Sequence, residues 1–354
     1  MSATAEALWA RLARAQLVSG EMPAEHGVPT PWYVRVMLCF AGLLAAAFLL
    51  GFVAVGAPFL VENRSAASVT GLALVAAAYA LFRSAQRSDF AAMFALAVSF
   101  AGQALFVFGF FALFDHGTDI GRWAAIAAVE LVLALVMPNF IHRLMSAFAA
   151  GLAATQALVS LGAGSLAAGL ALPVALLWLN EARYARRLAV LVPIAYGLTL
   201  AFLHAETLAF GARWMALPHT LELPPWGAAW LGVALASAAL LATVTTLLKR
   251  AGPAWTARRA APALVACAAI AAASFEAPGI AGGLMIVLLG YSNGNRVLTG
   301  LGLAGLVFYV SAYYYLLELT LLRKSAVLAA TGLALLAARW VVLGLVLREK
   351  GRHA

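Results

Sequence analysis

The chain has 354 residues, of which 65% are hydrophobic and only 10% are charged. Soluble domains carry about 25% charged residues, so this composition excludes an ordinary water-soluble globular protein. The formal net charge of +9 does not indicate nucleic-acid binding, because the basic residues lie singly or in small groups between apolar runs and form no basic stripe.

Residues 1–30 are predicted to form a cytoplasmic, amphipathic segment beside the membrane. Leu8, Leu12 and Ala15 recur at helical spacing, with Arg11 and Arg14 between them. A helix of this kind lies on a membrane surface, and a solvated lead-in helix is the alternative. The segment has neither the continuous apolar core nor the small-residue cleavage pattern of a signal peptide.

Apolar runs recur over residues 31–348 and predict one multi-pass transmembrane domain, followed by a short basic tail at 349–354. A helix needs about 20 apolar residues to cross a bilayer. We therefore predict an all-α polytopic bundle of about twelve transmembrane helices. The runs within 146–180 and at 280–291 are short for a full crossing. The predicted spans cover residues 36–60, 66–82, 90–114, 123–141, 146–161, 167–180, 188–210, 226–248, 260–275, 280–291, 298–322 and 327–347.

The distribution of Lys and Arg predicts that both termini are cytoplasmic, because basic residues collect in cytoplasmic loops. With the N-terminus inside, most of the 23 basic residues fall on the inner side. Arg323 and Lys324 are the exception, since they fall outside, between the last two spans. Either one short span does not cross the membrane, or outer groups compensate these two charges.

Ionisable side chains within the spans mark candidate functional positions, because a charge at the bilayer centre costs about 2.5–3.5 kcal/mol on insertion scales. We predict an outer polar cluster in which acidic residues balance the two misplaced basic ones. Snorkelling to the headgroups, a helix end or a hydrogen-bonded structural role are the alternatives. The cluster comprises Glu276, Glu318, Arg323, Lys324, His204 and Glu206.

Glu130 lies nearest the predicted membrane midplane, and its predicted partner is Arg339, which also falls within a span. A structural ion pair and a proton or ion path are both open for this midplane pair. His204 and Glu206 are two residues apart on one helix, so they do not face each other and do not form a local catalytic or metal pair.

The sequence predicts no cofactor, metal or catalytic site. Cys39 and Cys267 lie far apart in separate apolar runs, without the spacing of a metal or redox motif. The segment 290–296 is a polar turn that a helix connection explains, because Asn-Gly favours tight turns.

Two stretches resemble a known bacterial family of polytopic membrane proteins, the domain of unknown function 4401. They are PWYVRVMLCFAGLLAAAFLLGF at 31–52, and 274–332, which contains SFEAPGIAGG, the tyrosines 313–315 and the Lys324-Ser325 step. The resemblance implies a bacterial inner-membrane location. By association it also implies two partners, a second multi-pass membrane protein and a small membrane-anchored protein with a GDYxxLxY motif. It implies no substrate.

Two functional hypotheses follow. The first is a non-enzymatic component of an envelope complex that docks through the outer cluster, with lipids and membrane proteins as its partners. The second is a transporter or flippase-like protein that uses Glu276, Glu318 and Lys324, with Glu130, along a solute or proton path. A membrane enzyme is less favoured, because the longest outward loop offers only His219 and Glu222.

Overall fold

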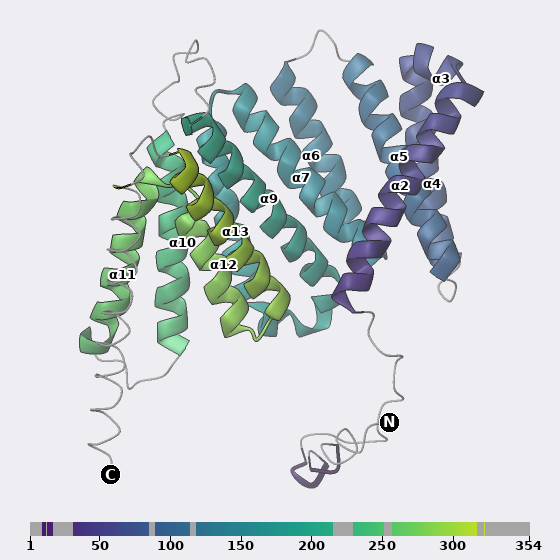
Figure 1. Ribbon diagram of the computed structural model, residues 1–354. Helices are drawn as coiled ribbons and strands as arrows, with labels where there is room; N and C mark the ends of the chain where they lie inside the picture. Colours follow the sequence, from purple (N-terminus) through teal and green to yellow (C-terminus); the bar gives the residue numbers. More distant parts are fainter. Residues whose placement is uncertain are drawn as a thin grey trace. The chain divides into compact units, whose positions relative to one another are not determined.

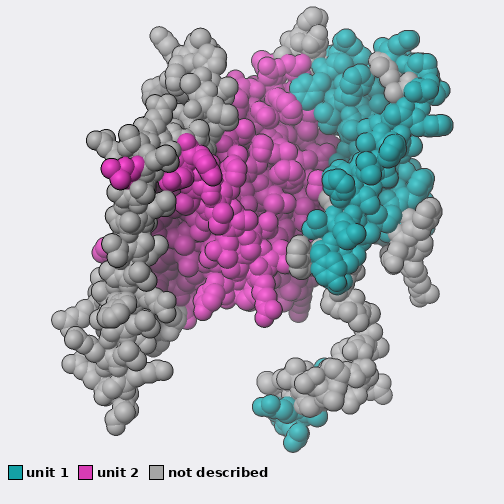
Figure 2. Space-filling model, viewed as in Figure 1, with its two compact units in different colours: residues 1–113 teal, residues 114–354 magenta. Residues whose placement is uncertain are grey.

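The computed structural model describes residues 9–11, 13–16, 31–84, 89–113, 118–214, 229–250, 257–316 and 322, and all regular structure in these ranges is helical (Figure 1). The all-α prediction is therefore confirmed for the described residues. The chain divides into two compact units, Met1–Leu113 and Phe114–Ala354 (Figure 2).

The first unit is held together by a close contact between two helices with small residues at their interface. Its helices are α2 (Trp32–Gly56), α3 (Phe59–Glu62), α4 (Arg64–Ser84) and α5 (Asp89–Leu113). A Cβ on Gly71 of α4 would lie 2.5 Å from the backbone nitrogen of Phe106 on α5, and one on Gly109 would lie 2.5 Å from Ser68 Oγ. Such small-residue contacts are typical of helix pairs in membranes.

The second unit is a bundle in which a short helix is enclosed by longer ones. Its elements are α6 (Asp119–Val136), α7 (Phe140–Ser160), η1 (Gly164–Leu170), α8 (Ala171–Leu179), η2 (Glu181–Arg187), α9 (Leu188–Trp214), α10 (Ala229–Arg250), α11 (Ala257–Glu276), α12 (Ile280–Ser292) and α13 (Arg296–Leu316). Helix α8 contributes Val174 and Trp178 to the core, where they meet Phe202 of α9, Leu240 of α10 and Met285 of α12.

The polar turn predicted at 290–296 connects α12 to α13 and ties both helices to α8 and α9. Asn293 Nδ2 donates to the carbonyl oxygen of Trp178 at 2.8 Å and to Glu181 Oε2 at 3.1 Å. Tyr196 donates its hydroxyl hydrogen to Asn295 Oδ1 at 2.8 Å. These bonds pair both asparagine amides with groups of α8, η2 and α9 at an end of the unit that would otherwise leave them unpaired.

The described part of the chain supports several of the twelve predicted membrane spans. In the described ranges, six helices are long and apolar enough to cross a membrane. Three shorter apolar helices accompany them, at Gly164–Leu179, Ala263–Phe275 and Ile280–Ser292. At the N-terminus, residues 9–11 and 13–14 are helical and mostly exposed. Residues 15–16 form an exposed turn, and residues 17–30, the last predicted span and the basic tail lie outside the described residues.

The predicted boundary between the fourth and fifth spans is wrong. Helix α6 ends at Val136 rather than residue 141, and α7 already begins at Phe140. Pro138 lacks a backbone N–H and disfavours a helical residue before it, which separates the two helices. Asn139 then starts α7, because its Oδ1 accepts hydrogen bonds from the backbone nitrogens of Ile141 and His142.

Candidate functional site

The most distinctive polar group in the described membrane helices is the carboxyl group of Glu206 on α9. This side chain is only 3% exposed. A backbone hydrogen bond from Gly279 reaches the carboxylate. A Cβ added to Gly282 would lie 3.7 Å from Glu206 Cγ, so the side chain lies against the first turn of α12. The positive end of the α12 dipole therefore stabilises a negative charge at this position.

The junction between α11 and α12 places the N-terminus of α12 at this position. Ser274 Oγ donates to the carbonyl oxygen of Ile270 at 2.8 Å and accepts from the backbone nitrogen of Ala281 at 3.1 Å, which links the two helices across the break. Pro278 and Gly279 turn the chain, and Gly279 has φ +96°. A side chain is strained at such a φ, so the turn requires glycine.

Tyr309 of α13 forms the wall behind this junction. A Cβ on Gly279 would lie 2.6 Å from the Tyr309 ring, so the ring packs directly on the glycine. The Tyr309 hydroxyl donates to the carbonyl oxygen of Leu203 at 2.7 Å and lies 3.3 Å from Thr207 Oγ1. These contacts join α13 to α9 at Leu203, three residues before Glu206, and at Thr207, the residue after it, and they hold α12 against α9.

Glu206 also lines a cavity of about 100 Å³. Its walls come from η1, α9, the first turn of α10 and the α11–α12 junction, and they are mostly apolar. The lining residues are Ser165, Ala168, Glu206, Ala209, Trp230, Gly232, Val233, Phe275 and Pro278. The second carboxyl oxygen, Glu206 Oε1, is buried and has no hydrogen-bond partner among the described residues. An unsatisfied buried acceptor is costly, and the adjoining cavity is large enough for water or a small ligand to satisfy it.

A second buried polar group connects α6 and α7. Glu130 is 4% exposed, and its side chain forms a hydrogen bond with Ser146. Ser146 Oγ lies 3.4 Å from Nδ1 of His142, which is fully buried. Glu130 Oε2 has no partner in the described part of the chain. Arg339, the predicted partner of Glu130, lies outside the described residues, so the midplane pair stays a prediction.

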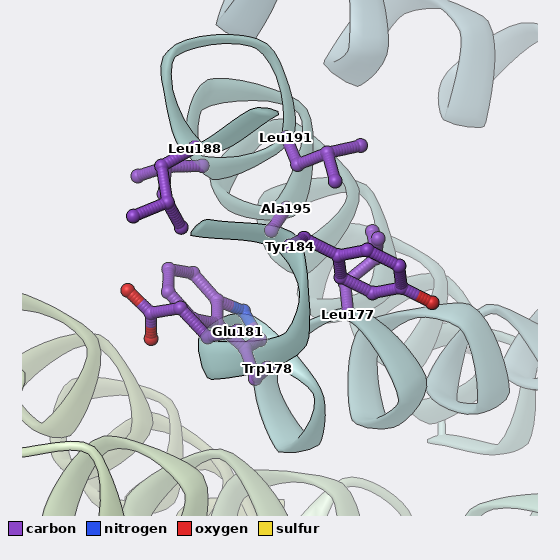
Figure 3. A pocket seen from close by; sticks show the side chains of 8 residues that line it. Leu177, Trp178, Glu181, Tyr184, Leu188, Leu191 and Ala195 are labelled. Atoms are coloured by element: carbon purple, nitrogen blue, oxygen red, sulfur yellow. The ribbon is translucent and has the colours of Figure 1, made fainter. Parts of the chain in front are cut away.

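A small pocket lies at the other end of α9, around Trp178 and Glu181 (Figure 3). Its volume is about 10 Å³, which is room for about one water molecule. Trp178 Nε1 donates to Thr199 Oγ1 at 3.1 Å, and Glu181 accepts from Asn293. Trp178 and Glu181 are thus already paired with other groups of the protein, and the space is too small for a solute larger than water.

A comparison with protein families gives a match that spans most of the chain. The family described as a domain of unknown function (DUF4401) matches residues 31–345, from the start of α2 through both compact units. The chain belongs to this family. The resemblance in the sequence is thereby confirmed. No curated protein and no solved structure matches the chain.

In this DUF4401 protein, the structure describes only part of the predicted outer cluster. Glu206 is buried at the cavity, whereas His204 is half-buried and is not one of the cavity residues. Glu276 is the last residue of α11, and its side chain is not described. Glu318, Arg323 and Lys324 lie outside the described residues, so the cluster itself stays a prediction.

Several residues of the site were missed in the sequence. Ser165 and Trp230 come from segments far from Glu206 in the chain, and no local pattern links them to it. His142 was missed for a different reason, because the span was predicted to begin at Ser146 and left His142 in a loop. The correct start at Phe140 puts His142 and Ser146 four residues apart on one helix face.

The turn after α12 also has the Gly-x-Ser-x-Gly spacing, at Gly290–Gly294, although no catalytic site was predicted from the sequence. In hydrolases this spacing forms a sharp turn from a strand into a helix, with the serine exposed as nucleophile. Here it lies where α12 ends, and Ser292 Oγ donates to the carbonyl oxygen of Leu289 at 3.0 Å. The geometry is that of a helix end and does not support a nucleophile.

The arrangement around Glu206 suits the binding of a small molecule or ion. Among the described residues, no group of three His, Cys, Asp or Glu side chains is placed to hold a metal ion. A buried carboxylate beside a cavity can accept a proton, accept a hydrogen bond or pair with a cation.

Proposed function

We propose that this DUF4401 protein is a non-enzymatic, multi-pass protein of the bacterial cytoplasmic (inner) membrane that binds a small solute at Glu206, as a transporter does. The observation that carries the proposal is the Glu206 carboxyl group, which is buried, lines a cavity of about 100 Å³ and has an oxygen, Oε1, with no hydrogen-bond partner among the described residues. Ionisable groups buried in membrane helices are expensive, and they commonly mark solute or ion paths.

The helices around Glu206 support this proposal. The helical structure is interrupted at Pro278–Gly279, and the 13-residue helix α12 starts beside the Glu206 carboxyl group. On another wall, the 3-10 segment η1 leads into the nine-residue helix α8. Transporters build solute sites from interrupted helices of this kind, because a helix end inside the membrane exposes backbone dipoles to the solute.

The predicted topology is part of the proposal. With about twelve spans and both termini cytoplasmic, the start of α10 and the junction between α11 and α12 fall on the outer side. The cavity would then be the outer binding site of a transporter, and solute would enter it from the outer side of the membrane.

The second candidate is a component of an envelope complex. It is favoured by the family association with a second multi-pass protein and a GDYxxLxY protein, and by the apolar surface of α2, where Phe40, Phe48 and Phe52 are exposed. In a membrane, lipid or a partner helix would cover such a surface.

A paired experiment separates the two candidates. The Glu206→Gln variant and the control Glu62→Gln, which alters an exposed carboxylate of α3, are purified in mild detergent from native membranes. Each preparation is analysed by mass spectrometry for partners, and by thermal unfolding in the presence of a panel of small solutes.

Transport predicts that one class of solute raises the melting temperature of the unaltered and Glu62→Gln proteins and not that of Glu206→Gln, with the same co-purified proteins in all three. A stoichiometric membrane protein that is lost only from Glu206→Gln, with no solute effect, would instead support the complex and refute the solute site.

A further inference from the structure

We infer that the Glu206 cavity binds a small organic cation, an ammonium ion that carries only a few carbon atoms. This inference rests on the proposed function and specifies the ligand of the same site. It follows from the charge of the cavity, from its aromatic walls and from its volume, which are independent observations.

The charge of the lining selects a cation. Of the described residues that line the cavity, Glu206 alone is ionisable, and no Lys, Arg or His stands among them. The backbone of Gly279 hydrogen-bonds to the carboxylate, and Oε1 has no partner among the described residues. A ligand with an N–H donor and a positive charge would hydrogen-bond to this carboxylate and neutralise the buried charge in one step, because charge-assisted hydrogen bonds are the strong ones.

The walls of the cavity suit an organic cation better than a metal ion. Trp230 and Phe275 both line it, and aromatic faces attract ammonium groups and their alkyl substituents. A bare metal cation needs six or more oxygen ligands in the case of Ca²⁺, and an octahedral set for Mg²⁺. The described lining supplies one carboxylate and one serine hydroxyl, with apolar groups around them.

The volume limits the size of the ligand. An engineered apolar cavity of about 150 Å³ holds one benzene molecule, so about 100 Å³ has room for a somewhat smaller group. Methylammonium and trimethylammonium fit this limit, whereas a polyamine or a nucleoside does not. A proton alone would neutralise Glu206 and leave this space unfilled.

The test is a titration of the purified full-length protein in lipid nanodiscs with trimethylammonium and with isopropanol, a neutral molecule of similar size and shape. Binding is followed by calorimetry and by tryptophan fluorescence. The variants are Glu206→Gln, which keeps the side-chain shape and removes the charge, and Trp230→Leu, with Glu62→Gln as the control.

We expect saturable binding of trimethylammonium that weakens by about tenfold or more in Glu206→Gln and about threefold or more in Trp230→Leu, and stays unchanged in Glu62→Gln. Isopropanol should bind at least about tenfold more weakly. Because the ligand pair is compared on the unaltered protein, the test stands even where Glu206→Gln fails to fold.

Equal binding of isopropanol and trimethylammonium would overturn the cation inference and leave a solute site at Glu206 intact. Binding of trimethylammonium that neither Glu206→Gln nor Trp230→Leu weakens would also overturn it, since the cation would then bind elsewhere. If trimethylammonium does not bind while a neutral solute stabilises the protein and this effect is lost in Glu206→Gln, the cation inference fails and the proposed function survives. If no solute of any class binds, both fail.

Discussion

Replacing Gly279 by alanine should destabilise the protein strongly, for two separable reasons. The residue has φ +96°, and a non-glycine residue in such a region costs about 1–3 kcal/mol. The new Cβ would also lie 2.6 Å from the ring of Tyr309, which is buried and hydrogen-bonded to Leu203. Overpacking of this kind costs a further ~1–3 kcal/mol. The expected loss of unfolding free energy is therefore about 2–6 kcal/mol, a large part of the stability of a typical protein.

The chain supplies a matched control at the other end of the same helix. Gly294 also has a positive φ, +64°, but a Cβ there would meet nothing within 4 Å. Gly294→Ala should therefore lose only the backbone contribution, about 1–2 kcal/mol. Both variants are unfolded in mild detergent by heat and by denaturant titration, and their free energies of unfolding are compared with that of the unaltered protein.

The contribution of the ring can be isolated by a double-mutant cycle. In a Tyr309→Ala background the clash is gone, so Gly279→Ala should cost about 1–3 kcal/mol less than in the unaltered protein. Equal costs for Gly279→Ala and Gly294→Ala, or an absence of coupling with Tyr309, would refute the reasoning that the ring packs against this turn.

Three further predictions use the same unfolding measurements. Gly71→Ala should lower the free energy of unfolding by about 1–3 kcal/mol, because its Cβ would meet backbone atoms of α5. Gly51→Ala, whose Cβ would meet nothing within 4 Å, should raise it by up to about 1 kcal/mol. The same sign for both variants would contradict the packing of α4 on α5. Asn293→Ala should cost about 1–3 kcal/mol through its lost hydrogen bonds, and a neutral result would count against the polar turn as a tie between helices. Glu130→Gln should change stability by less than about 1 kcal/mol if Ser146 is the main partner, and a loss of about 3–5 kcal/mol would instead indicate a buried ion pair with Arg339.

The sequence predicts the helices well where a long apolar run is bounded by charged or turn residues. The limits of α5 and the starts of α9 and α12 fall within a few residues of their predicted positions. In these places the helix ends where its apolar run ends, because that is where the chain leaves the apolar environment. The prediction fails at Pro138, where apolar residues continue on both sides of the break. Hydropathy does not register a missing backbone N–H, so the start of α7 and the burial of His142 could not be read from it.

The candidate site is harder to predict, because burial depends on which face of a helix meets its neighbours. His204 and Glu206 have the same local sequence environment and lie close together along α9, yet only Glu206 is buried among α9, α12 and the cavity. Helix α9 is apolar on nearly every side, so its sequence offers no amphipathic pattern from which a face could be chosen. The helices that pack against α9 determine which of its faces is buried, and they lie far from it in the sequence.

The stretch that carries the family resemblance has a direct physical connection to Glu206. Ser274 bridges the break between α11 and α12, Gly279 makes the turn, and Tyr309 packs on that glycine and bonds to the backbone of α9. Together these contacts place a helix N-terminus against the carboxyl group. A side chain at Gly279 should therefore disturb Glu206 by shifting the backbone of this turn, which bonds to the carboxylate. If ligand binding survives in a folded Gly279→Ala protein, the α12 end does not position the carboxylate.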